Sequence, residues 1–334
     1  MKNHDMNHSH KPAAIHWGII GCGDVTEHKS GPAFHNVPHS SLFGVMRRDG
    51  EKASDYAGRH QVQFWTDDAS RLIHHPQVNA IYVATPPKYH EEYVVAALEA
   101  GKPVYVEKPF SVDVASCLRM QTVADACNKK LTVAHYRRAL PKFIQIREWL
   151  EQGLVGDIRL VNIQLYQSKL SEQVAKSWRV IPEIAGAGLF YDLAPHQLDL
   201  LFYFFGDTVR AIGQAVNQAG LYAAEDQVSG MVEMEHAVFV NGSWCFTTAP
   251  EWVRVLFDII GSSGRISVSV FGHDLAIESG TLNEQLQYTP PQHIQQPMIE
   301  QVVGYFRGEH ENPCPASEAI KSMRLMESCV YGNK

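Results

Sequence analysis

The sequence predicts a doubly wound α/β domain followed by an open, mainly antiparallel β-sheet domain with helices. Its 334 residues exceed the length of a typical single domain, so two domains sharing an interface are the default expectation. Residues 14–138 alternate short apolar runs with helical segments, which is typical of a parallel sheet covered on both faces. Residues 139–334 instead contain closely spaced segments of alternating polarity, which is typical of antiparallel strands.

The elements of the first domain follow from apolar runs and from helical spacing. The helical pattern is clearest over residues 112–130, where apolar side chains recur every three or four positions. Predicted strands cover residues 15–20, 42–46, 80–85, 103–108 and 131–136, and predicted helices cover residues 50–60, 90–102 and 112–130.

The second domain begins with a predicted helix over residues 141–156, and a mostly apolar helix over residues 188–206 interrupts its strands. The terminal segment, residues 316–331, is predicted to form a helix that can pack back on the first domain. Predicted strands cover residues 158–167, 208–217, 227–236, 237–248, 254–263, 265–271 and 274–279.

Charge and composition argue against several classes of protein. The chain carries 36 acidic and 29 basic residues, and no run of Lys and Arg is long enough to suggest a nucleic-acid or membrane surface. No apolar run approaches the roughly eighteen residues needed to cross a bilayer. The six cysteines form no C-x-x-C pair, so we expect neither a disulfide framework nor a metal site, and reduced thiols fit a cytoplasmic location.

The first thirteen residues are expected to form a disordered leader. They contain three histidines but no apolar core of the kind that a secretory signal requires. A metal-binding tail formed by His4, His8 and His10 is the alternative, and a solvated leader is the interpretation that we favour.

A glycine-rich turn follows the first predicted strand. Gly21 and Gly23 allow a tight turn, and they let backbone N–H groups of the segment that continues through Asp24 and Val25 approach a pyrophosphate. The third glycine of the usual G-x-G-x-x-G pattern is Thr26, so the motif is incomplete. Its place at the first strand of a βαβ unit nevertheless favours a Rossmann dinucleotide-binding domain.

The second strand runs directly into Arg47, Arg48 and Asp49. A carboxylate is expected at this point if the cofactor is NAD(H), because it binds the ribose 2′-hydroxyl. Two guanidinium groups suit the 2′-phosphate of NADP(H) instead. We therefore expect NADP(H), with NAD(H) as the alternative in which Asp49 takes the part of the acid.

Two further motifs carry groups suited to chemistry. Glu107, Lys108 and Pro109 follow a parallel strand at the edge where ligands bind in open α/β sheets. In the second domain, Asp192 and His196 are four residues apart and would share one face of a helix. Pro195 lies between them, so the shared face depends on a local kink or a late helix start.

The order of these motifs resembles the glucose–fructose oxidoreductase/inositol dehydrogenase (Gfo/Idh/MocA) family from about residue 14 to the end of the chain. The resemblance includes the A-T-P-x-x-x-H stretch ending at His90, the R-x-x-P segment at Arg138, and a W-R pair before the D-x-x-x-H-x-x-D segment. It implies an NAD(P)-dependent oxidoreductase acting on a sugar- or polyol-like substrate. The cofactor-binding residues it implies are Gly21, Gly23, Asp24, Val25, Arg47, Arg48, Thr85, Pro86, His90, Glu107, Lys108, Arg138, Trp178 and Arg179. The predicted substrate-binding residues are Lys108, Asp192 and His196, together with Tyr166 and Tyr191, whose rings offer stacking surfaces and hydrogen bonds suited to a polyol.

The chemistry assigns a role to each catalytic residue. An imidazole titrates near neutral pH, so His196 is assigned as the acid or base that moves the hydroxyl proton. Lys108 is the cation that polarises the substrate oxygen, and Asp192 anchors the substrate. The sequence is equally compatible with an exchange of roles between Lys108 and His196.

Two other functions occur on the same fold and stay open at this point. One is an NAD-dependent glycosidase, which releases no net reduced cofactor. The other is a non-catalytic sensor of dinucleotide and sugar, which would be expected to lack one member of the lysine–histidine pair. The apolar residues of the second domain also predict a homodimer or homotetramer assembled through its sheet.

Overall fold

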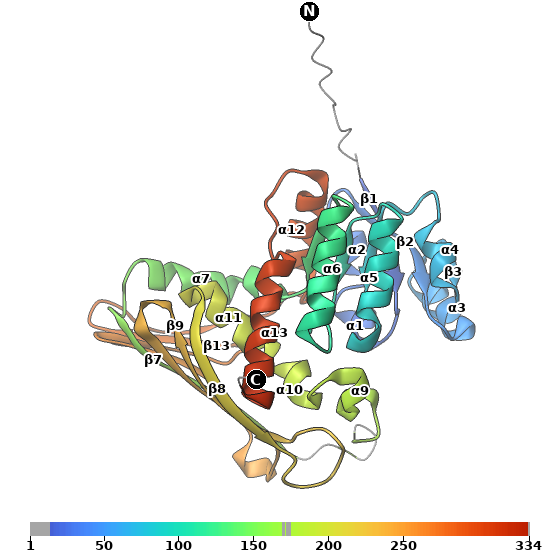
Figure 1. Cartoon of the computed structure of the whole chain (residues 1–334). Helices are drawn as coiled ribbons and strands as arrows, with labels where there is room; N and C mark the ends of the chain where they lie inside the picture. The colour runs from blue at the N-terminus through green and yellow to red at the C-terminus, as the bar shows by residue number, and fades with distance from the viewer. Residues whose placement is uncertain (1–13, 169–170, 172–174, 333–334) are drawn as a thin grey trace, which may run out of the picture.

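The structure, a computed structural model, describes residues 14–168, 171 and 175–332. The predicted leader, residues 1–13, and with it the histidine tail of His4, His8 and His10, lies outside the described residues. Two sheets dominate the molecule, one in each half of the chain (Figure 1).

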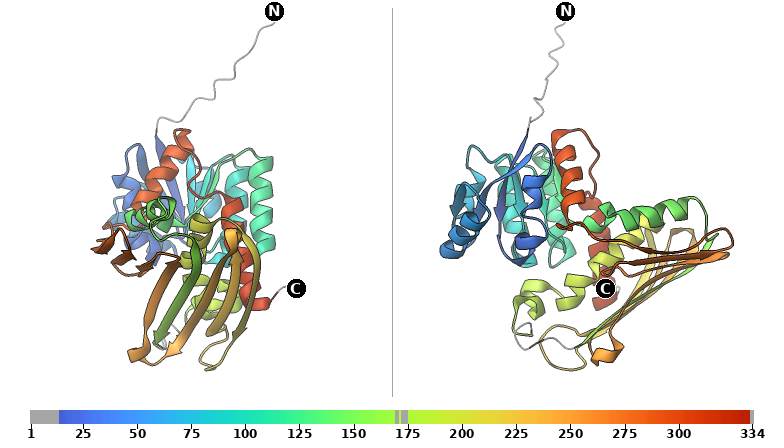
Figure 2. Two further views of the ribbon diagram at one scale, coloured as in Figure 1. Left: turned by 90° about the vertical axis from the view of Figure 1, so that its left-hand side faces the viewer. Right: turned by 180° about the vertical axis from the view of Figure 1, so that it is seen from behind.

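The first sheet is a parallel, doubly wound sheet of six strands in the order β3-β2-β1-β4-β5-β6, with helices on both sides (Figure 2). The strand order reverses between β1 and β4, so the carboxyl ends of these strands open a crevice there. The strands are β1 (Ile15–Ile20), β2 (Ser40–Met46), β3 (Phe64–Thr66), β4 (Ala80–Val83), β5 (Val104–Val106) and β6 (Leu131–Val133). The helices are α1 (Asp24–His28), α2 (Ala33–Asn36), α3 (Gly50–Arg59), α4 (Ala69–Ile73), η1 (Pro87–Tyr89), α5 (His90–Glu99), α6 (Val114–Ala126) and η2 (Tyr136–Ala139).

The second sheet has eight strands in the order β14-β13-β12-β11-β7-β10-β9-β8, and only β7 and β10 pair in parallel. The predicted fold class is thereby confirmed. The strands are β7 (Ile158–Ser168), β8 (Thr208–Val216), β9 (Gln227–Met234), β10 (Val238–Thr248), β11 (Arg254–Gly261), β12 (Gly264–Val268), β13 (Asp274–Ser279) and β14 (Asn283–Gln287). The helices are α7 (Pro141–Glu151), η3 (Trp178–Val180), α9 (Pro182–Ala185), α10 (Gly188–Leu193), α11 (Pro195–Phe205), η4 (Glu235–Ala237), η5 (Pro250–Trp252), α12 (Gln296–Arg307) and α13 (Ala316–Tyr331).

Helix α13 packs on both domains, and helix α12 packs on the first. The side chain of Glu327 in α13 accepts a hydrogen bond from the backbone N–H of Val114 at 2.8 Å, at the start of α6. Helix α12, which the sequence analysis did not predict, brings Phe306 to within 5.5 Å of the Trp17 ring in β1. A boundary after residue 138 therefore separates the two sheets, whereas α12 returns to the first domain and α13 contacts both.

Helix α13 also lies unusually close to the second sheet. A Cβ atom added to Gly213 of β8 would lie 2.4 Å from the Cα of Cys329, and one added to Gly230 of β9 would lie 2.9 Å from its Sγ. Glycine at these two positions lets the helix rest directly on the strands. At these two positions the helix and the strands therefore contact each other with no side chain of the strand between them.

The predicted helix over residues 188–206 is two helices. Helix α10 ends at Leu193, and Pro195 is the first residue of α11, where a proline needs no hydrogen-bonding N–H. Asp192 therefore lies in the last turn of one helix and His196 in the first turn of the next. The break at Pro195 is present, but Asp192 and His196 lie on two successive helices and do not share one face of a single helix.

The helices α7, α11 and α13 lie on one face of the second sheet, and the strands of its other face are uncovered (Figure 2). Large apolar side chains are exposed on β8, β9 and β10: Val209 (63%), Ile212 (57%), Met231 (61%) and Phe239 (50%).

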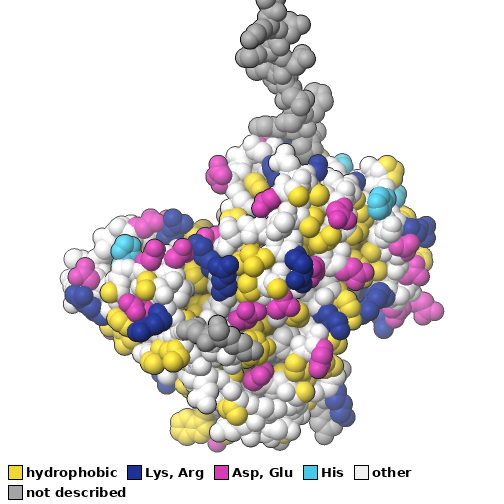
Figure 3. Space-filling model, viewed as in Figure 1, with side chains coloured by type: hydrophobic (Ala, Val, Ile, Leu, Met, Phe, Trp, Pro, Cys, Tyr) yellow, Lys and Arg dark blue, Asp and Glu magenta, His cyan; other side chains and the backbone are white. Residues whose placement is uncertain are grey.

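On the face seen in Figure 3, acidic and basic side chains are interspersed and form no extended field of one sign. None of the helices in the described part of the chain combines the length and apolar character that crossing a bilayer requires.

Candidate active site

Two adjoining cavities occupy the crevice between the sheets. The outer cavity, about 420 Å³, lies against the glycine turn after β1 and against Arg47 and Arg48 after β2. The inner cavity, about 110 Å³, lies against Lys108 after β5 and against His196 of α11. The residues that line both cavities, and so form the passage between them, are Val25, Ala84, Thr85, Trp178 and Arg179.

Glycine is required where the outer cavity meets the sheet. Gly21 has φ +97°, and a Cβ atom there would lie 2.8 Å from the backbone of Ala84 and Thr85 at the end of β4. Gly23 has open space on its Cβ side, with no heavy atom of the described residues nearer than 4.0 Å. The first glycine thus closes the turn, and the second leaves room for a ligand to approach the backbone.

The cations at the end of β2 border the outer cavity. Arg47 donates to the backbone carbonyl of Cys22 at 3.2 Å, and the Arg48 guanidinium lies 4.8 Å from the centroid of the Tyr89 ring. The Asp49 carboxylate is engaged elsewhere, because it accepts from the N–H of Lys52 at 3.2 Å and pairs with its ammonium at 2.9 Å. Asp49 therefore caps α3, and the two arginines border the space beside it.

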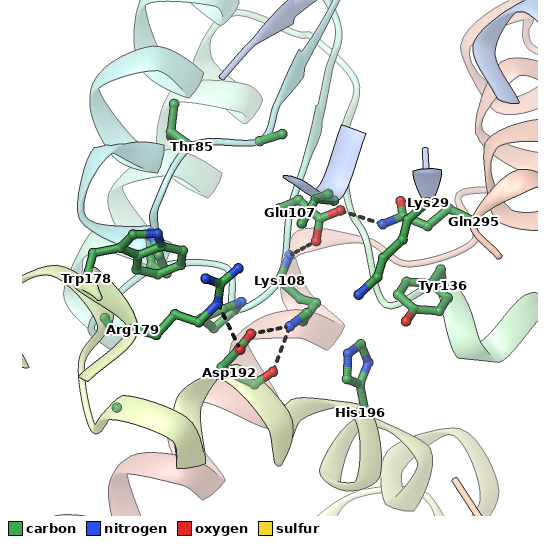
Figure 4. A pocket seen from close by; sticks show the side chains of 16 residues that line it. Lys29, Thr85, Glu107, Lys108, Tyr136, Trp178, Arg179, Asp192, His196 and Gln295 are labelled. Atoms are coloured by element: carbon green, nitrogen blue, oxygen red, sulfur yellow. Dashed lines mark hydrogen bonds and ion pairs between the residues drawn. The ribbon is translucent and has the colours of Figure 1, made fainter. Parts of the chain in front are cut away.

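An ion pair across the two domains forms the floor of the inner cavity (Figure 4). The Lys108 ammonium donates to Oδ1 of Asp192 at 2.9 Å and to its backbone oxygen at 2.7 Å. That carbonyl belongs to the last turn of α10, where carbonyl groups lack partners within the helix. Arg179 Nε lies 3.6 Å from the other carboxylate oxygen of Asp192.

The charges of this pair reinforce one another. Burial opposes the charge on Lys108, but the carboxylates of Asp192 and Glu107 outweigh it, and the pKa of Lys108 is raised. Burial likewise opposes ionisation of Asp192, but Lys108 and Arg179 outweigh it, and the pKa of Asp192 is lowered. Both side chains are therefore charged at neutral pH.

His196 is buried and electrically neutral. Burial, followed by the positive charges of Lys108 and Arg137, lowers its pKa well below the ordinary value. Its ring packs edge-on against Tyr136 and Phe271, with centroids 5.2 and 5.6 Å apart. Its Nδ1 has no hydrogen-bond partner within the described residues, and Figure 4 shows the ring directed toward the space between Lys108 and Tyr136.

Glu107 supports Lys108 from behind. Its Oε1 accepts from the Tyr82 hydroxyl at 2.5 Å and from the Gln295 amide at 2.6 Å, and its Oε2 accepts from the backbone N–H of Lys108 at 3.1 Å. The carboxylate is 95% buried, so these three donors satisfy a group that solvent does not reach. Glu107 thus fixes the turn that carries Lys108.

Most of the residues predicted from the sequence line the two cavities. The outer cavity contains Gly21, Gly23, Asp24, Val25, Arg47, Arg48, Thr85, Pro86, Trp178 and Arg179. The inner cavity contains Glu107, Lys108, Asp192 and His196, and shares Val25, Thr85, Trp178 and Arg179 with the outer one.

Four predicted binding residues lie away from both cavities. His90 is fully buried, and its ring nitrogens lie 2.8 Å from the carbonyl oxygen of Thr85 and 3.1 Å from that of Phe110. The His90 ring thus links the turn after β4 to the turn after β5 inside the core. Arg138 is held by both carboxylate oxygens of Asp199, at 2.7 and 2.8 Å.

The other two are tyrosines of the second domain. Tyr166 lies on β7 and donates to the Ser243 hydroxyl at 3.2 Å, within the sheet. Tyr191 is fully buried, because its ring fills the space beside Gly186, where an added Cβ would lie 2.4 Å from it. Residue type suggested sugar contacts for both, and the packing directs their rings elsewhere.

Sequence reasoning missed three polar residues of the inner cavity: Lys29, Tyr136 and Gln295. Lys29 is the residue that ends α1, and Tyr136 opens the short helix η2 just after β6. Their positions next to the ends of α1 and β6, at the edge of the sheet where ligands bind, could have identified them as candidate site residues. Gln295 precedes α12, and the sequence analysis did not predict that helix.

The outer cavity and the passage fit a dinucleotide. Thr85 lies where the two cavities meet, and its Oγ1 is buried with no hydrogen-bond partner within the described residues. A buried hydroxyl without a partner is costly unless a ligand supplies one. Together with the open side of Gly23, this indicates a site built for a bound group. The described residues contain no cluster of three or more His, Cys, Asp or Glu side chains able to hold a metal ion.

Comparison with known proteins agrees with this arrangement. A family model described as "Oxidoreductase family, NAD-binding Rossmann fold" matches residues 15–135, and the GFO/IDH/MocA C-terminal domain model matches residues 143–267. The chain is 40% identical over 316 residues to "Oxidoreductase P35" of Formosa agariphila, with 94% of this chain and 97% of the relative covered. It is 26% identical over 260 residues to the inositol 2-dehydrogenase of Acidothermus cellulolyticus, with 77% and 73% covered.

Solved structures share the fold. A levoglucosan dehydrogenase in complex with NADH and levoglucosan matches with a TM-score of 0.84 at 19% identity, covering 95% of this chain and 96% of that one. An oxidoreductase from Thermotoga maritima matches with a TM-score of 0.84 at 23% identity, covering 95% of both chains. The family models, the 40% identical relative and the two-sheet architecture lead to one conclusion: the chain belongs to the Gfo/Idh/MocA family of NAD-binding oxidoreductases.

Proposed function

We propose that this protein is an NAD(P)-dependent dehydrogenase or reductase that interconverts a secondary alcohol and a ketone on a sugar- or polyol-like substrate. The observation that carries the proposal is the inner cavity. A neutral imidazole without a partner and a charged lysine face the same small space, and that space opens into a dinucleotide-sized cavity. Relatives described as an inositol dehydrogenase and a levoglucosan dehydrogenase support this substrate class.

The residues of the inner cavity divide the work of proton transfer and charge stabilisation. A bound nicotinamide dinucleotide supplies or takes up the hydride. Asp192 engages two of the three N–H groups of the Lys108 ammonium, which leaves one to donate to the substrate oxygen. His196, being neutral, is ready to accept the hydroxyl proton when the alcohol is oxidised. Asp192 holds Lys108 in place and charged.

The presence of both proton-handling groups in one cavity favours an enzyme over a sensor. A glycosidase of the same fold is distinguished by its products, since only a dehydrogenase accumulates reduced cofactor when it is supplied with an alcohol. A cytoplasmic location, suggested by six free cysteines, stays a prediction.

NADP(H) is the cofactor that we propose. Two guanidinium groups border the outer cavity beyond the glycine turn, and the only nearby acid of the β2–α3 turn in the described residues, Asp49, is engaged with Lys52. A 2′-phosphate would find two cations there, whereas the free 2′-hydroxyl of NAD(H) would compete with Lys52 for its acceptor.

We also propose that the uncovered face of the second sheet joins copies of the chain in a homodimer or homotetramer. Its exposed side chains include Ile212 and Met231, which are direct cross-strand neighbours on β8 and β9. An apolar patch on a sheet face is costly to leave in water.

Replacing the proposed base should slow turnover strongly without weakening the binding of the cofactor. We expect His196→Ala to lower kcat by roughly 10²- to 10⁴-fold, since a positioned acid or base contributes about that much. NADPH titration followed by tryptophan fluorescence is the control, and the dissociation constant should be close to that of the wild type. Turnover at the wild-type rate would remove His196 from the mechanism.

The pH dependence of alcohol oxidation follows from the two shifted groups. Protonation of His196 removes the base, and its pKa lies well below 6.5; loss of the proton from Lys108 removes the cation, and its pKa is raised. We therefore expect kcat/KM to be constant from well below pH 6.5 into the alkaline range. An acid limb centred at or above 6.5 that disappears in His196→Ala would contradict the neutral imidazole.

Reversing the charge of Arg48 tests the cofactor choice. We expect Arg48→Asp to lower the ratio of kcat/KM for NADPH to that for NADH by about tenfold or more, because a charge-assisted contact to phosphate is lost and a repulsion is introduced. Arg71→Asp on α4 makes the same charge change away from both cavities and should leave the ratio close to that of the wild type. Equal effects of the two variants would argue against a 2′-phosphate site.

A charge in the middle of the apolar face tests the assembly. We expect Met231→Lys to lower the molar mass measured by light scattering after size-exclusion chromatography, because the lysine would have to be buried at the interface. Leu118→Lys, at a 40% exposed position on α6, is the matched control and should not change the mass. A monomeric wild-type protein would refute the assembly directly.

A further inference from the structure

The inner cavity contains a second lysine, Lys29, which has no role in the proposed proton transfer. Lys29 ends α1, and its backbone carbonyl accepts from the N–H of Gln295 at 3.2 Å, which fixes the start of the side chain. Figure 4 shows its ammonium group directed into the cavity, toward Tyr136 and His196 and away from Thr85. Lys29 is not among the residues that line the outer cavity, where the glycine turn would meet the phosphates of a dinucleotide.

The charge of Lys29 has no counterpart in the described part of the chain. No carboxylate there lies within ion-pair distance of its ammonium group, whereas Lys108 and Arg179 both contact Asp192. The oxygens of Glu107 are occupied by three other donors. The field of Lys29 nevertheless reaches the site, because it contributes to lowering the pKa values of both Asp192 and His196.

Among the residues that line the inner cavity, positive charges exceed negative charges by one, and the charge without a carboxylate partner in the described residues is that of Lys29, because Arg179 lies 3.6 Å from Asp192 and 4.0 Å from Asp24. The lining contains three cations, Lys29, Lys108 and Arg179, and two carboxylates, Glu107 and Asp192, while His196 is neutral. A neutral polyol would leave this excess uncompensated. A substrate with one negative charge would compensate it.

We propose that the substrate is a sugar acid whose carboxylate binds Lys29 and the hydroxyl of Tyr136, while its reacting hydroxyl or carbonyl faces Lys108 and His196. This inference rests on the proposed dehydrogenase function and specifies its substrate class. An ammonium group and a phenol offer two donors to the two oxygens of a carboxylate, and one uncompensated positive charge matches one negative charge. A sugar phosphate, with up to two charges and three terminal oxygens, fits this pair of donors less well.

Matched pairs of sugars test the inference on the NADPH complex. The acids D-glucuronate, D-galacturonate and D-gluconate are compared with D-glucose, D-galactose and D-sorbitol, and D-glucose 6-phosphate serves as the phosphate probe. Binding is followed by the change in fluorescence of bound NADPH, and turnover by initial rates in both directions. We expect at least one acid to bind about tenfold more tightly than its neutral partner.

The variant Lys29→Gln, which removes the charge and retains a polar side chain, should reduce that preference to near unity. Lys88→Gln is the matched control, because Lys88 is an exposed lysine of η1 that lines neither cavity, and it should keep the wild-type preference. Tighter binding of neutral sugars, stronger binding of the phosphate, no saturable binding of any acid at millimolar concentration, or an unchanged preference in Lys29→Gln would each overturn the inference. A protein that oxidises neutral sugars normally would refute only the sugar acid, whereas failure to bind either dinucleotide would refute the proposed function itself.

Discussion

The bond between Lys108 and Asp192 is the contact on which the geometry of the site depends. Lys108 belongs to the turn after β5 in the first domain, and Asp192 belongs to the end of α10 in the second. The lysine contacts both the carboxylate and the backbone oxygen of Asp192, so it fixes the helix end as well as the side chain. Removing one partner of a buried pair typically costs about 3 to 5 kcal/mol, because the other charge stays buried and unpaired. The pair of Lys108 and Asp192 therefore fixes the distance between the two domains at the site.

The interruption at Pro195 makes this contact possible. In one continuous helix the carbonyl of Asp192 would accept the N–H of residue 196, and Asp192 and His196 would point from a single face. Because α10 ends at Leu193, the carbonyl is left for Lys108, and α11 starts with its own orientation. The two side chains then approach the cavity from different helices. Pro195 therefore helps to form the site, although a proline between Asp192 and His196 would be expected to disrupt a helix that carries both.

The predicted residues that line the two cavities are those whose positions are fixed by local backbone chemistry. The glycine turn, the end of β2 and the turn after β5 occupy positions that the strand order of a doubly wound sheet places together, so their clustering follows once the strands are recognised. Two predicted residues that line neither cavity had been chosen by side-chain type alone. Tyr166 and Tyr191 have side chains suited to sugars, but one points within the sheet and the other fills the core beside Gly186. The direction of a side chain at such positions is decided by tertiary packing, which a single sequence does not display.

The missed residues share a different cause. Gln295 reaches Glu107 from 188 positions away in the chain, and it does so because α12 returns to cover β1. Short elements such as β3 and β14 have too few residues for a period to be recognised. Helix α12 does carry the helical period, because Met298, Ile299, Val302, Val303 and Phe306 recur at helical spacing and are buried, and the sequence analysis overlooked it. The sequence therefore contains a signal for the helix, but none for the distant element against which it packs.

The electrostatics of the crevice can be understood as a single arrangement along its length. The outer cavity is bordered by the guanidinium groups of Arg47 and Arg48, the inner one by the ammonium groups of Lys29 and Lys108, and Arg179 lies between them. The acids of both cavities are engaged with particular cations or donors. A neutral base fits such surroundings, because the cations that stabilise an oxyanion also disfavour a charged imidazole, and burial of the ring acts in the same direction. The lowered pKa of His196 and the positive lining are thus two consequences of one distribution of charge. A substrate that brings its own negative charge would moderate that field at the point where the imidazole must accept a proton, so the binding of the acid and the basicity of His196 are coupled through Lys29.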